Sequence, residues 1–168
     1  MSRDKKFSRD KREKPEYDQK LLDLARVARV VKGGRRFRFR ATLVIGNRKG
    51  KVGVGVGKGA DVSDAIKKAF DDAKKSLVTV SMKGNTIVHD IEHKKGAARI
   101  ILRKAVSGRG IIAGGAIRTV VDLAGIKDIV SKSLGTPNKL SVARAVVEAL
   151  SILNVSRTRK TRLGAENK

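Results

Sequence analysis

The sequence predicts an α+β protein of two small units, because stretches with strand periodicity and stretches with helix periodicity follow one another along the chain. Residues 35–58 alternate apolar side chains with polar residues or glycine, which is typical of strands. Residues 61–77 and 138–153 place apolar side chains three or four positions apart, which is typical of helices. The 168 residues suffice for two small domains, and Gly84-Asn85 predicts the boundary between them.

Both ends of the chain are poor in the apolar residues that a folded core needs. Residues 1–20 combine eight Lys or Arg with five Asp or Glu, so we expect residues 1–19 to form an arm that is mobile until it binds a partner. An unstructured tail that only improves solubility is the alternative. Residues 156–168 form a similar basic tail. The sequence has no signal peptide and no apolar run of about 18 residues, so we expect no membrane partner.

The first folded unit, residues 20–83, is predicted to contain a three-stranded sheet and a helix. Its opening segment, Leu21–Lys32, is ambiguous, because its spacing fits a helix while its valines favour a strand. After Gly33-Gly34, two alternating segments flank a turn at residues 46–50 and predict a hairpin with one buried face. Asp61 is predicted to cap the helix that covers this face.

The second unit, residues 84–155, is predicted to be a two-layer α/β domain of β-β-α-β-α order. Thr86–His93 and Ala97–Lys104 have strand character, and a glycine-rich loop then leads into a helix that Gly125 ends. A strand at Ile126–Leu134 follows, and Thr136-Pro137-Asn138 begins the last helix.

The charge of the chain indicates a polyanionic partner. Forty Lys and Arg stand against 16 Asp and Glu, a formal net charge of +24. Residues 26–58 contain 11 Lys or Arg and no acid, so mutual repulsion argues against a merely solvated surface. A row of guanidinium groups on a rigid sheet engages several phosphates at once. We therefore predict RNA contacts at Arg26, Arg29, Lys32, Arg35, Arg36, Arg38, Arg40, Arg48, Lys49, Lys51 and Lys58.

Three alternating glycines, Gly53, Gly55 and Gly57, interrupt the second strand of the predicted hairpin. Glycine weakens a strand unless something must approach its backbone closely. Either an RNA backbone lies against this face, which adds the three glycines to the predicted RNA contacts, or a tight twist or bulge packs the strand against its neighbour. The sequence leaves both possibilities open.

The sequence lacks the parts of an enzyme, a metal site or a cofactor site. It contains no Cys, and its only histidines, His89 and His93, lie in a segment of strand character that would place them about 13 Å apart. Residues 55–60 and 108–113 fit a dinucleotide-binding pattern, but Leu77 to Val80 in the first case and Ile129-Val130 in the second occupy the region where we expect the acidic residue of such a site. Lys58 is followed by Gly59, so there is no Walker loop.

Two ordered motifs resemble a known family. The signature of the bacterial-type ribosomal small-subunit protein five family resembles residues 31–37, which include Lys32-Gly33-Gly34-Arg35, together with Ala41, residues 44–47 and 50–53, Gly55 and Gly57-Lys58. A second motif, Gly108 to Gly115 with Arg118 one turn later, supports the likeness. The chain departs from the pattern at Val54 and Val56, where the family often has aromatic residues, and at Gly59, where it has Ala.

The resemblance implies a double-stranded-RNA-binding-like first domain and a second domain of the type named after this family. It implies a structural, non-enzymatic constituent of the small subunit of cytoplasmic ribosomes that binds rRNA and contacts small-subunit proteins four and eight. It also implies roles in decoding accuracy, in stabilising the head against the body, and in lining the path by which mRNA enters. Gly33 and Gly34 join the implied RNA contacts, near the family's spectinomycin site. A free double-stranded-RNA-binding or RNA-chaperone protein is the alternative.

The glycine-rich loop of the second unit is predicted to contact another protein. Glycines permit positive φ angles and close approach, and neighbouring isoleucines offer apolar contact. The resemblance points to protein four as the partner, whereas a loop that only packs on its own sheet is the alternative. The predicted interface residues are Gly108, Arg109, Gly110, Ile111, Ile112, Gly114, Gly115 and Arg118.

Overall fold

The structure is a computed structural model that describes residues 16–153. The tail predicted at 156–168 and residues 1–15 of the predicted arm lie outside the described residues. Asp18 and Gln19, which the prediction assigned to the arm, belong to the first strand, which begins at Asp18. None of the described helices is long and apolar enough to span a membrane.

The first unit is an antiparallel four-stranded sheet with one helix on it, so the fold is α+β as predicted. The ambiguous segment after Leu21 is a strand, and a two-residue strand after the helix adds to the three that were predicted. Asp61 occupies the N-cap position of the helix, although its side chain makes no capping hydrogen bond. In spatial order the strands are β1 (Asp18–Val31), β2 (Gly34–Gly46), β3 (Lys51–Gly59) and β4 (Val78–Thr79), and the helix is α1 (Val62–Lys75).

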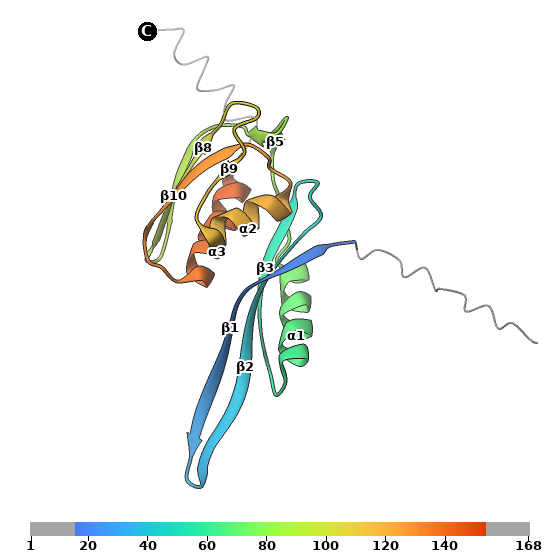
Figure 1. Ribbon diagram of the computed structural model, residues 1–168, viewed down its shortest axis with the longest axis vertical. Helices are drawn as coiled ribbons and strands as arrows, with labels where there is room; N and C mark the ends of the chain where they lie inside the picture. The colour runs from blue at the N-terminus through green and yellow to red at the C-terminus, as the bar shows by residue number, and fades with distance from the viewer. Residues whose placement is uncertain (1–15, 154–168) are drawn as a thin grey trace, which may run out of the picture.

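The hairpin of β1 and β2 extends far beyond the rest of the molecule (Figure 1). Residues 26–40, here called the extended hairpin, include its turn and the paired strand ends on either side of it. Helix α1 covers the apolar face of β2 only from about Phe39 onward, where Ala41 is fully buried. Beyond that point side chains on both faces are exposed, including Val30 at 75% and Phe37 at 47%. A folded core therefore does not explain the apolar residues of the extended hairpin.

The glycines of β3 lie directly under α1. A Cβ atom added to Gly53 would stand 2.6 Å from the Ala73 carbonyl oxygen, and Cβ atoms at Gly55 and Gly57 would clash with the helix backbone as well. This face is therefore closed to RNA, and the prediction that Gly53, Gly55 and Gly57 contact RNA is wrong. The alternative, a tight twist or bulge that packs the strand against its neighbour, does not explain the glycines either, because β3 pairs with β2 without a register shift and a helix packs on this face. The helix residues that face the glycines are the fully buried Ala65, Ala69 and Ala73.

The second unit contains the predicted β-β-α-β-α order with additional short strands. The predicted strand at Thr86–His93 is divided in two, because residues 88–90 leave the strand conformation. Gly125 ends the first helix at φ +91°, as predicted, and the Asn138 side chain accepts a 3.1 Å hydrogen bond from the Leu140 amide at the start of the last helix. The elements are β5 (Met82–Lys83), β6 (Thr86–Ile87), β7 (Ile91–Lys95), β8 (Ala98–Lys104), β9 (Ile111–Ile112), α2 (Gly115–Ala124), β10 (Ile129–Gly135) and α3 (Lys139–Ile152).

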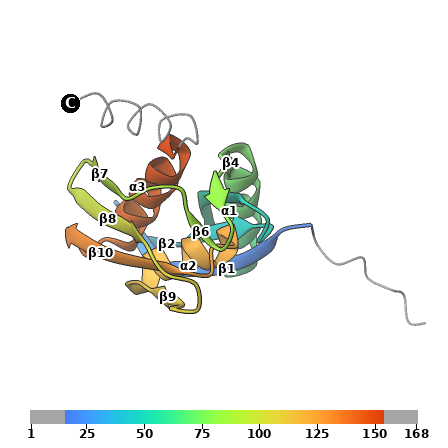
Figure 2. The same cartoon turned by 90° about the horizontal axis from the view of Figure 1, so that it is seen from above.

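The two units share one core. The second sheet, in the order β7-β8-β10-β9, lies on one side of α2 and α3, and the first sheet with α1 lies on the other (Figure 2). Val44, Val52 and Val54 of the first sheet belong to the same buried cluster as α2, α3 and β8. The hairpin was predicted to have one buried face, but Thr42 on its other face is only 2% exposed. The second unit covers that face, which local alternation does not reveal.

Backbone hydrogen bonds fix the turn between β2 and β3 to the C-terminal end of α2. The Arg48 amide donates to the Leu123 carbonyl at 3.0 Å, and the Gly50 amide donates to the Ala124 carbonyl at 2.9 Å. The last carbonyls of a helix have no partners within the helix. Here the turn between β2 and β3 of the first unit provides the donors for these carbonyls, so backbone hydrogen bonds join the two units at this point.

Candidate nucleic-acid interface

The register of β1 and β2 gives the extended hairpin two different faces. Directly paired residues of an antiparallel sheet point to the same side. Arg36 pairs with Arg29, Arg38 with Val27, and Arg40 pairs with Ala25 on one side and Lys58 of β3 on the other. One face of the hairpin is therefore strongly basic. We call it the arginine face, and its basic residues are Arg29, Arg36, Arg38, Arg40 and Lys58.

The cations of the arginine face are placed to bind several anionic groups at once. Side chains two residues apart on a strand are about 6.6 Å apart, so Arg36, Arg38 and Arg40 span about 13 Å. This spread suits separate phosphates of one backbone better than a single anion. The pairing of β1 with β2 sets this spacing between the arginines.

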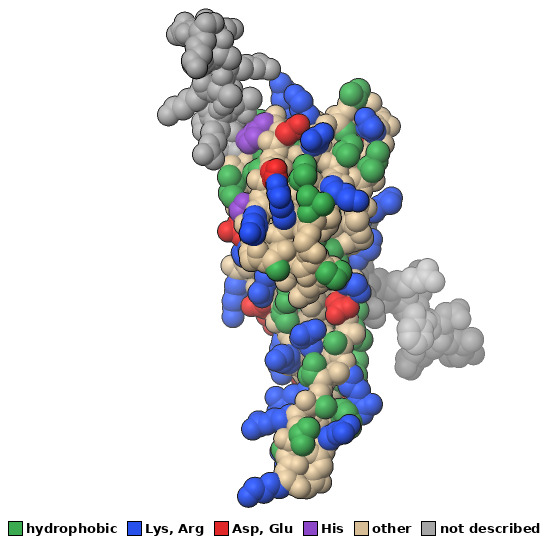
Figure 3. All heavy atoms as spheres, turned by 90° about the vertical axis from the view of Figure 1, so that its left-hand side faces the viewer, with side chains coloured by type: hydrophobic (Ala, Val, Ile, Leu, Met, Phe, Trp, Pro, Cys, Tyr) green, Lys and Arg blue, Asp and Glu red, His purple; other side chains and the backbone are tan. Residues whose placement is uncertain are grey.

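No carboxylate neutralises the extended hairpin within the described residues. None of the salt bridges in residues 16–153 includes one of its arginines or Lys32. Two cross-strand pairs even join like charges, Arg29 with Arg36 and Arg40 with Lys58. On the face shown in Figure 3, side chains near the narrow tip are basic or hydrophobic and none is acidic. Like charges in direct opposition destabilise a sheet, so this surface is suited to a polyanion.

The turn of the extended hairpin exposes backbone as well as charge. A Cβ atom added to Gly33 or Gly34 would meet no other atom within 4 Å, and Gly34 has φ +139°. Lys32 and Arg35 flank these glycines and are exposed. The implied RNA contacts at Gly33 and Gly34 therefore lie where a ligand has access.

A second basic group lies at the other end of β2. Strand β2 has 13 residues, so the turn bearing Arg48 and Lys49 stands about 40 Å from the tip of the extended hairpin. Lys49 and Lys51 are exposed, whereas the Arg48 Nε forms a 2.8 Å salt bridge with Asp18. The structure thus divides the basic residues that are contiguous in sequence into two separate groups.

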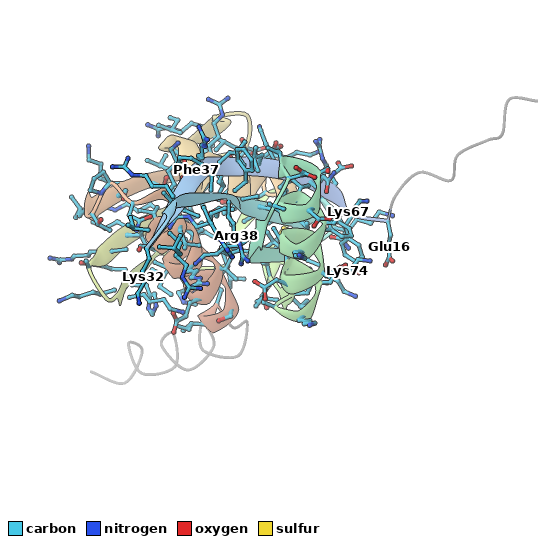
Figure 4. All side chains as sticks on the ribbon, turned by 90° about the horizontal axis from the view of Figure 1, so that it is seen from below. Glu16, Lys32, Phe37, Arg38, Lys67 and Lys74 are labelled. Atoms are coloured by element: carbon cyan, nitrogen blue, oxygen red, sulfur yellow. The ribbon has the colours of Figure 1, made fainter. Side chains whose placement is uncertain are left out.

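The opposite face of the extended hairpin carries an aromatic residue that the sequence analysis did not include in the interface. The Arg26 guanidinium lies 3.7 Å from the centroid of the Phe37 ring, a cation–π contact. Phe37 and Arg38 are neighbours on β2, and Figure 4 shows them on opposite sides of it. Alternation in the sequence assigned Phe37 to a buried face, because it cannot show where the covering helix ends.

The glycine-rich loop of the second unit is an exposed surface next to α2. Gly108 and Gly110 have φ +88° and +78°, and added Cβ atoms at these positions and at Gly114 and Gly115 would meet open space. Ile111 packs partly on the core, while Ile112 remains 48% exposed. The loop therefore packs partly on its own sheet, through Ile111 and the pairing of β9 with β10, and leaves the side chain of Ile112 half exposed. The remaining predicted interface residues, Arg109 and Arg118, are also exposed.

A buried carboxylate that the sequence analysis missed holds this loop. Asp128 is only 3% exposed, and its Oδ1 accepts hydrogen bonds from the amides of Gly108 at 3.1 Å and Gly110 at 2.9 Å. The Ile129 amide in turn donates to the Gly110 carbonyl at 3.2 Å. An acidic residue between the apolar Ile126 and Ile129 was the available signal, since a buried carboxylate needs hydrogen-bond donors.

Glu92 and His93, in the segment that carries the two histidines, take part in structural ion pairs. Glu92 pairs with Arg99 of the next strand, while Lys95 Nζ lies 2.6 Å and His93 Nε2 3.6 Å from Glu148 Oε2 on α3. The hydrogen bond from Lys95 is the main reason why the pKa of Glu148 is lowered. Among residues 16–153, no group of three or more His, Asp or Glu side chains is arranged to hold a metal ion.

Comparison with known proteins identifies the family of this fold. Residues 17–81 match the family described as ribosomal protein S5, N-terminal domain, and residues 93–159 match ribosomal protein S5, C-terminal domain. The chain is 54% identical over 144 residues to the small ribosomal subunit protein uS5 of Campylobacter jejuni strains 81-176 and RM1221. These alignments cover 86% of this chain and 98% of each relative. The two matches include both sheets, the extended hairpin and the glycine-rich loop, and the chain therefore belongs to the ribosomal protein S5 family.

Proposed function

We propose that this chain, a structural constituent of the small ribosomal subunit by its family membership, binds rRNA mainly through the arginine face of the extended hairpin. One observation carries this proposal: like-charged neighbours, Arg29 with Arg36 and Arg40 with Lys58, face each other, and none of the four takes part in a salt bridge within residues 16–153. Their repulsion opposes folding of the free hairpin. Phosphates that bind between these cations replace the repulsion with attraction, and binding also releases counterions condensed on the RNA.

We also propose a second rRNA contact at the turn between β2 and β3. Lys49 and Lys51 are exposed there, and hydrogen bonds to α2 hold the turn in place. Because the two basic groups are about 40 Å apart along β2, they reach different segments of a folded RNA. A protein with two separated contacts ties those segments together, which suits a structural role in a particle.

The glycine-rich loop supports a proposed contact with a neighbouring protein. Its exposed glycines allow close approach, Ile112 offers apolar surface, and Asp128 holds the loop in one conformation. The family resemblance points to small-subunit protein four as the partner and to decoding accuracy as the property affected. On the same basis we propose contact with protein eight, stabilisation of the head against the body, and a position along the path by which mRNA enters.

Sedimentation of the full chain with small subunits through a high-salt wash tests this function. A structural constituent remains in the subunit peak, because its release requires several contacts to break together. A free double-stranded-RNA-binding or RNA-chaperone protein leaves the peak, because its affinity comes mostly from salt-sensitive phosphate contacts. Loss of the chain from washed subunits would therefore favour the second class.

A further inference from the structure

The face of the extended hairpin opposite the arginine face carries apolar side chains that the described fold does not use. Phe37 is 47% exposed and Val30 is 75% exposed, and both lie beyond the part of the sheet that α1 covers. The residues paired with them across the hairpin are Ala28 and Arg35. Exposed phenyl and isopropyl groups on a strand pair without a core are costly in water unless a ligand covers them.

The Phe37 ring is held in place before any ligand binds. The Arg26 guanidinium lies over it with 3.7 Å to the ring centroid, on the same face of the strand pair. Guanidinium groups stack flat on aromatic rings, and a neighbouring flat group can extend such a stack. An aromatic ring beside an unpaired guanidinium therefore forms a small platform with a positive edge.

We propose that this platform stacks an unpaired base of the RNA whose phosphates bind the arginine face, an inference that rests on the proposed function. A nucleobase has the flat π surface that Phe37 can stack against, and its own phosphate lies within reach of arginines such as Arg26 and Arg35. An apolar surface of another protein satisfies the ring but leaves these cations without a partner. The acid-free surroundings therefore favour a base over a protein.

Two faces of different chemistry give the extended hairpin selectivity for RNA shape. The arginine face binds phosphates of paired or unpaired RNA alike, while the Phe37 face needs a base that is free to leave its helix. Figure 4 shows the two faces represented by Phe37 and Arg38 on either side of β2. The hairpin is thus suited to a junction or bulge rather than to a uniform duplex.

Ultraviolet cross-linking of small subunits reconstituted with the full chain is the first part of the test. Mass spectrometry of the digested protein should find a nucleotide adduct on the peptide that contains Phe37. A synthetic rRNA fragment around the cross-linked nucleotide then serves as the probe for binding. An adduct confined to other parts of the chain would overturn the proposal.

Two variants and two RNAs complete the test. Phe37→Leu should weaken binding about tenfold, the range expected for loss of one stacked base, without changing the slope of log affinity against log salt. Phe37→Tyr keeps the stack and should bind like the natural chain, and Val30→Ala is the matched control for lost apolar surface. With an abasic site at the cross-linked nucleotide, Phe37→Leu should have no further effect. An equal loss on intact and abasic RNA would overturn the stacking, whereas an unchanged salt slope in arginine-face variants would overturn the proposed function.

Discussion

Helix α1, which packs directly on β3, explains why glycines occupy alternate positions of that strand. Helix α1 approaches so closely that its carbonyls at Ala65, Ala69 and Ala73 occupy the space of the missing side chains. Small residues on both partners bring the helix axis near the sheet and bury the alanines completely. This close packing fixes the part of the sheet from which the extended hairpin projects.

Gly55→Ala should destabilise the fold by about 1–3 kcal/mol, because the new methyl group overlaps the Ala69 carbonyl and neither backbone can yield without repacking. Denaturant unfolding measures the change. Gly115→Ala is the matched control, since a Cβ atom there meets no atom within 4 Å and alanine favours a helix. Equal stability of the two variants would mean that α1 does not pack on β3 as described.

Asp128→Ala should expose the glycine-rich loop to local unfolding, because two amides lose their acceptor and a buried unsatisfied donor costs about 1–3 kcal/mol. Hydrogen exchange at Gly108 and Gly110 measures the loss of protection. Asp128→Asn retains an acceptor oxygen and should show a smaller change. If exchange at these amides is the same in all three proteins, Asp128 does not hold the loop.

The residue types in the sequence predicted which side chains share a face of a strand better than they predicted what covers that face. The acid-free run of arginines correctly placed Arg36, Arg38 and Arg40 on one face, because alternation alone determines facing within a strand. It could not show that Phe37 is exposed or that Gly55 is covered, since both depend on where α1 ends. Asp128 was missed because its partners, Gly108 and Gly110, are 18 to 20 positions away in sequence.

Among the elements, the hairpin of β1 and β2 shows how pairing overrides local propensity. Residues 21–32 fit a helix by spacing, yet they form a strand because β2 offers a partner along nearly its whole length. The sequence predicted the turn at Gly33-Gly34 and the alternation after it. It did not predict that the extended hairpin, residues 26–40, would project beyond the core, because an exposed strand pair and a half-buried strand pair have the same periodicity of two.

The ion pair between Glu148 of α3 and Lys95 of β7 predicts that the stability of the fold depends on pH. Lys95 lowers the pKa of Glu148 from its ordinary value of 4.5, so the carboxylate stabilises the fold above about pH 4.5 and this contribution is lost as the pH falls through the lowered pKa. Glu148→Gln should therefore melt at a slightly lower temperature than the natural chain near pH 7. The difference should shrink as the pH falls below 4.5 and through the lowered pKa of Glu148, because the carboxylate takes up a proton. A difference that stays constant from pH 7 to pH 3 would contradict this ion pair.

At the scale of the whole molecule, the two units are joined through a shared core and through backbone hydrogen bonds. Val44, Val52 and Val54 join both units in one core, and the turn at Arg48 and Gly50 caps α2. The two-unit organisation and the α+β class followed from the order of periodic segments in the sequence. The shared core did not, because an alternating strand shows that one face is apolar and cannot show that another unit will cover its second face at Thr42.

The salt dependence of rRNA binding tests most directly that the arginine face binds phosphate. Replacing Arg29, Arg36 and Arg38 by Gln should reduce the slope of log affinity against log salt by about two to three units, since each lost phosphate contact removes about one. The matched control replaces three exposed lysines outside the extended hairpin, Lys83, Lys94 and Lys132, by Gln and so changes the net charge equally. We expect the control to keep a slope close to that of the natural chain. An unchanged slope in the arginine variant, or an equal reduction in both variants, would contradict a specific phosphate contact at the extended hairpin.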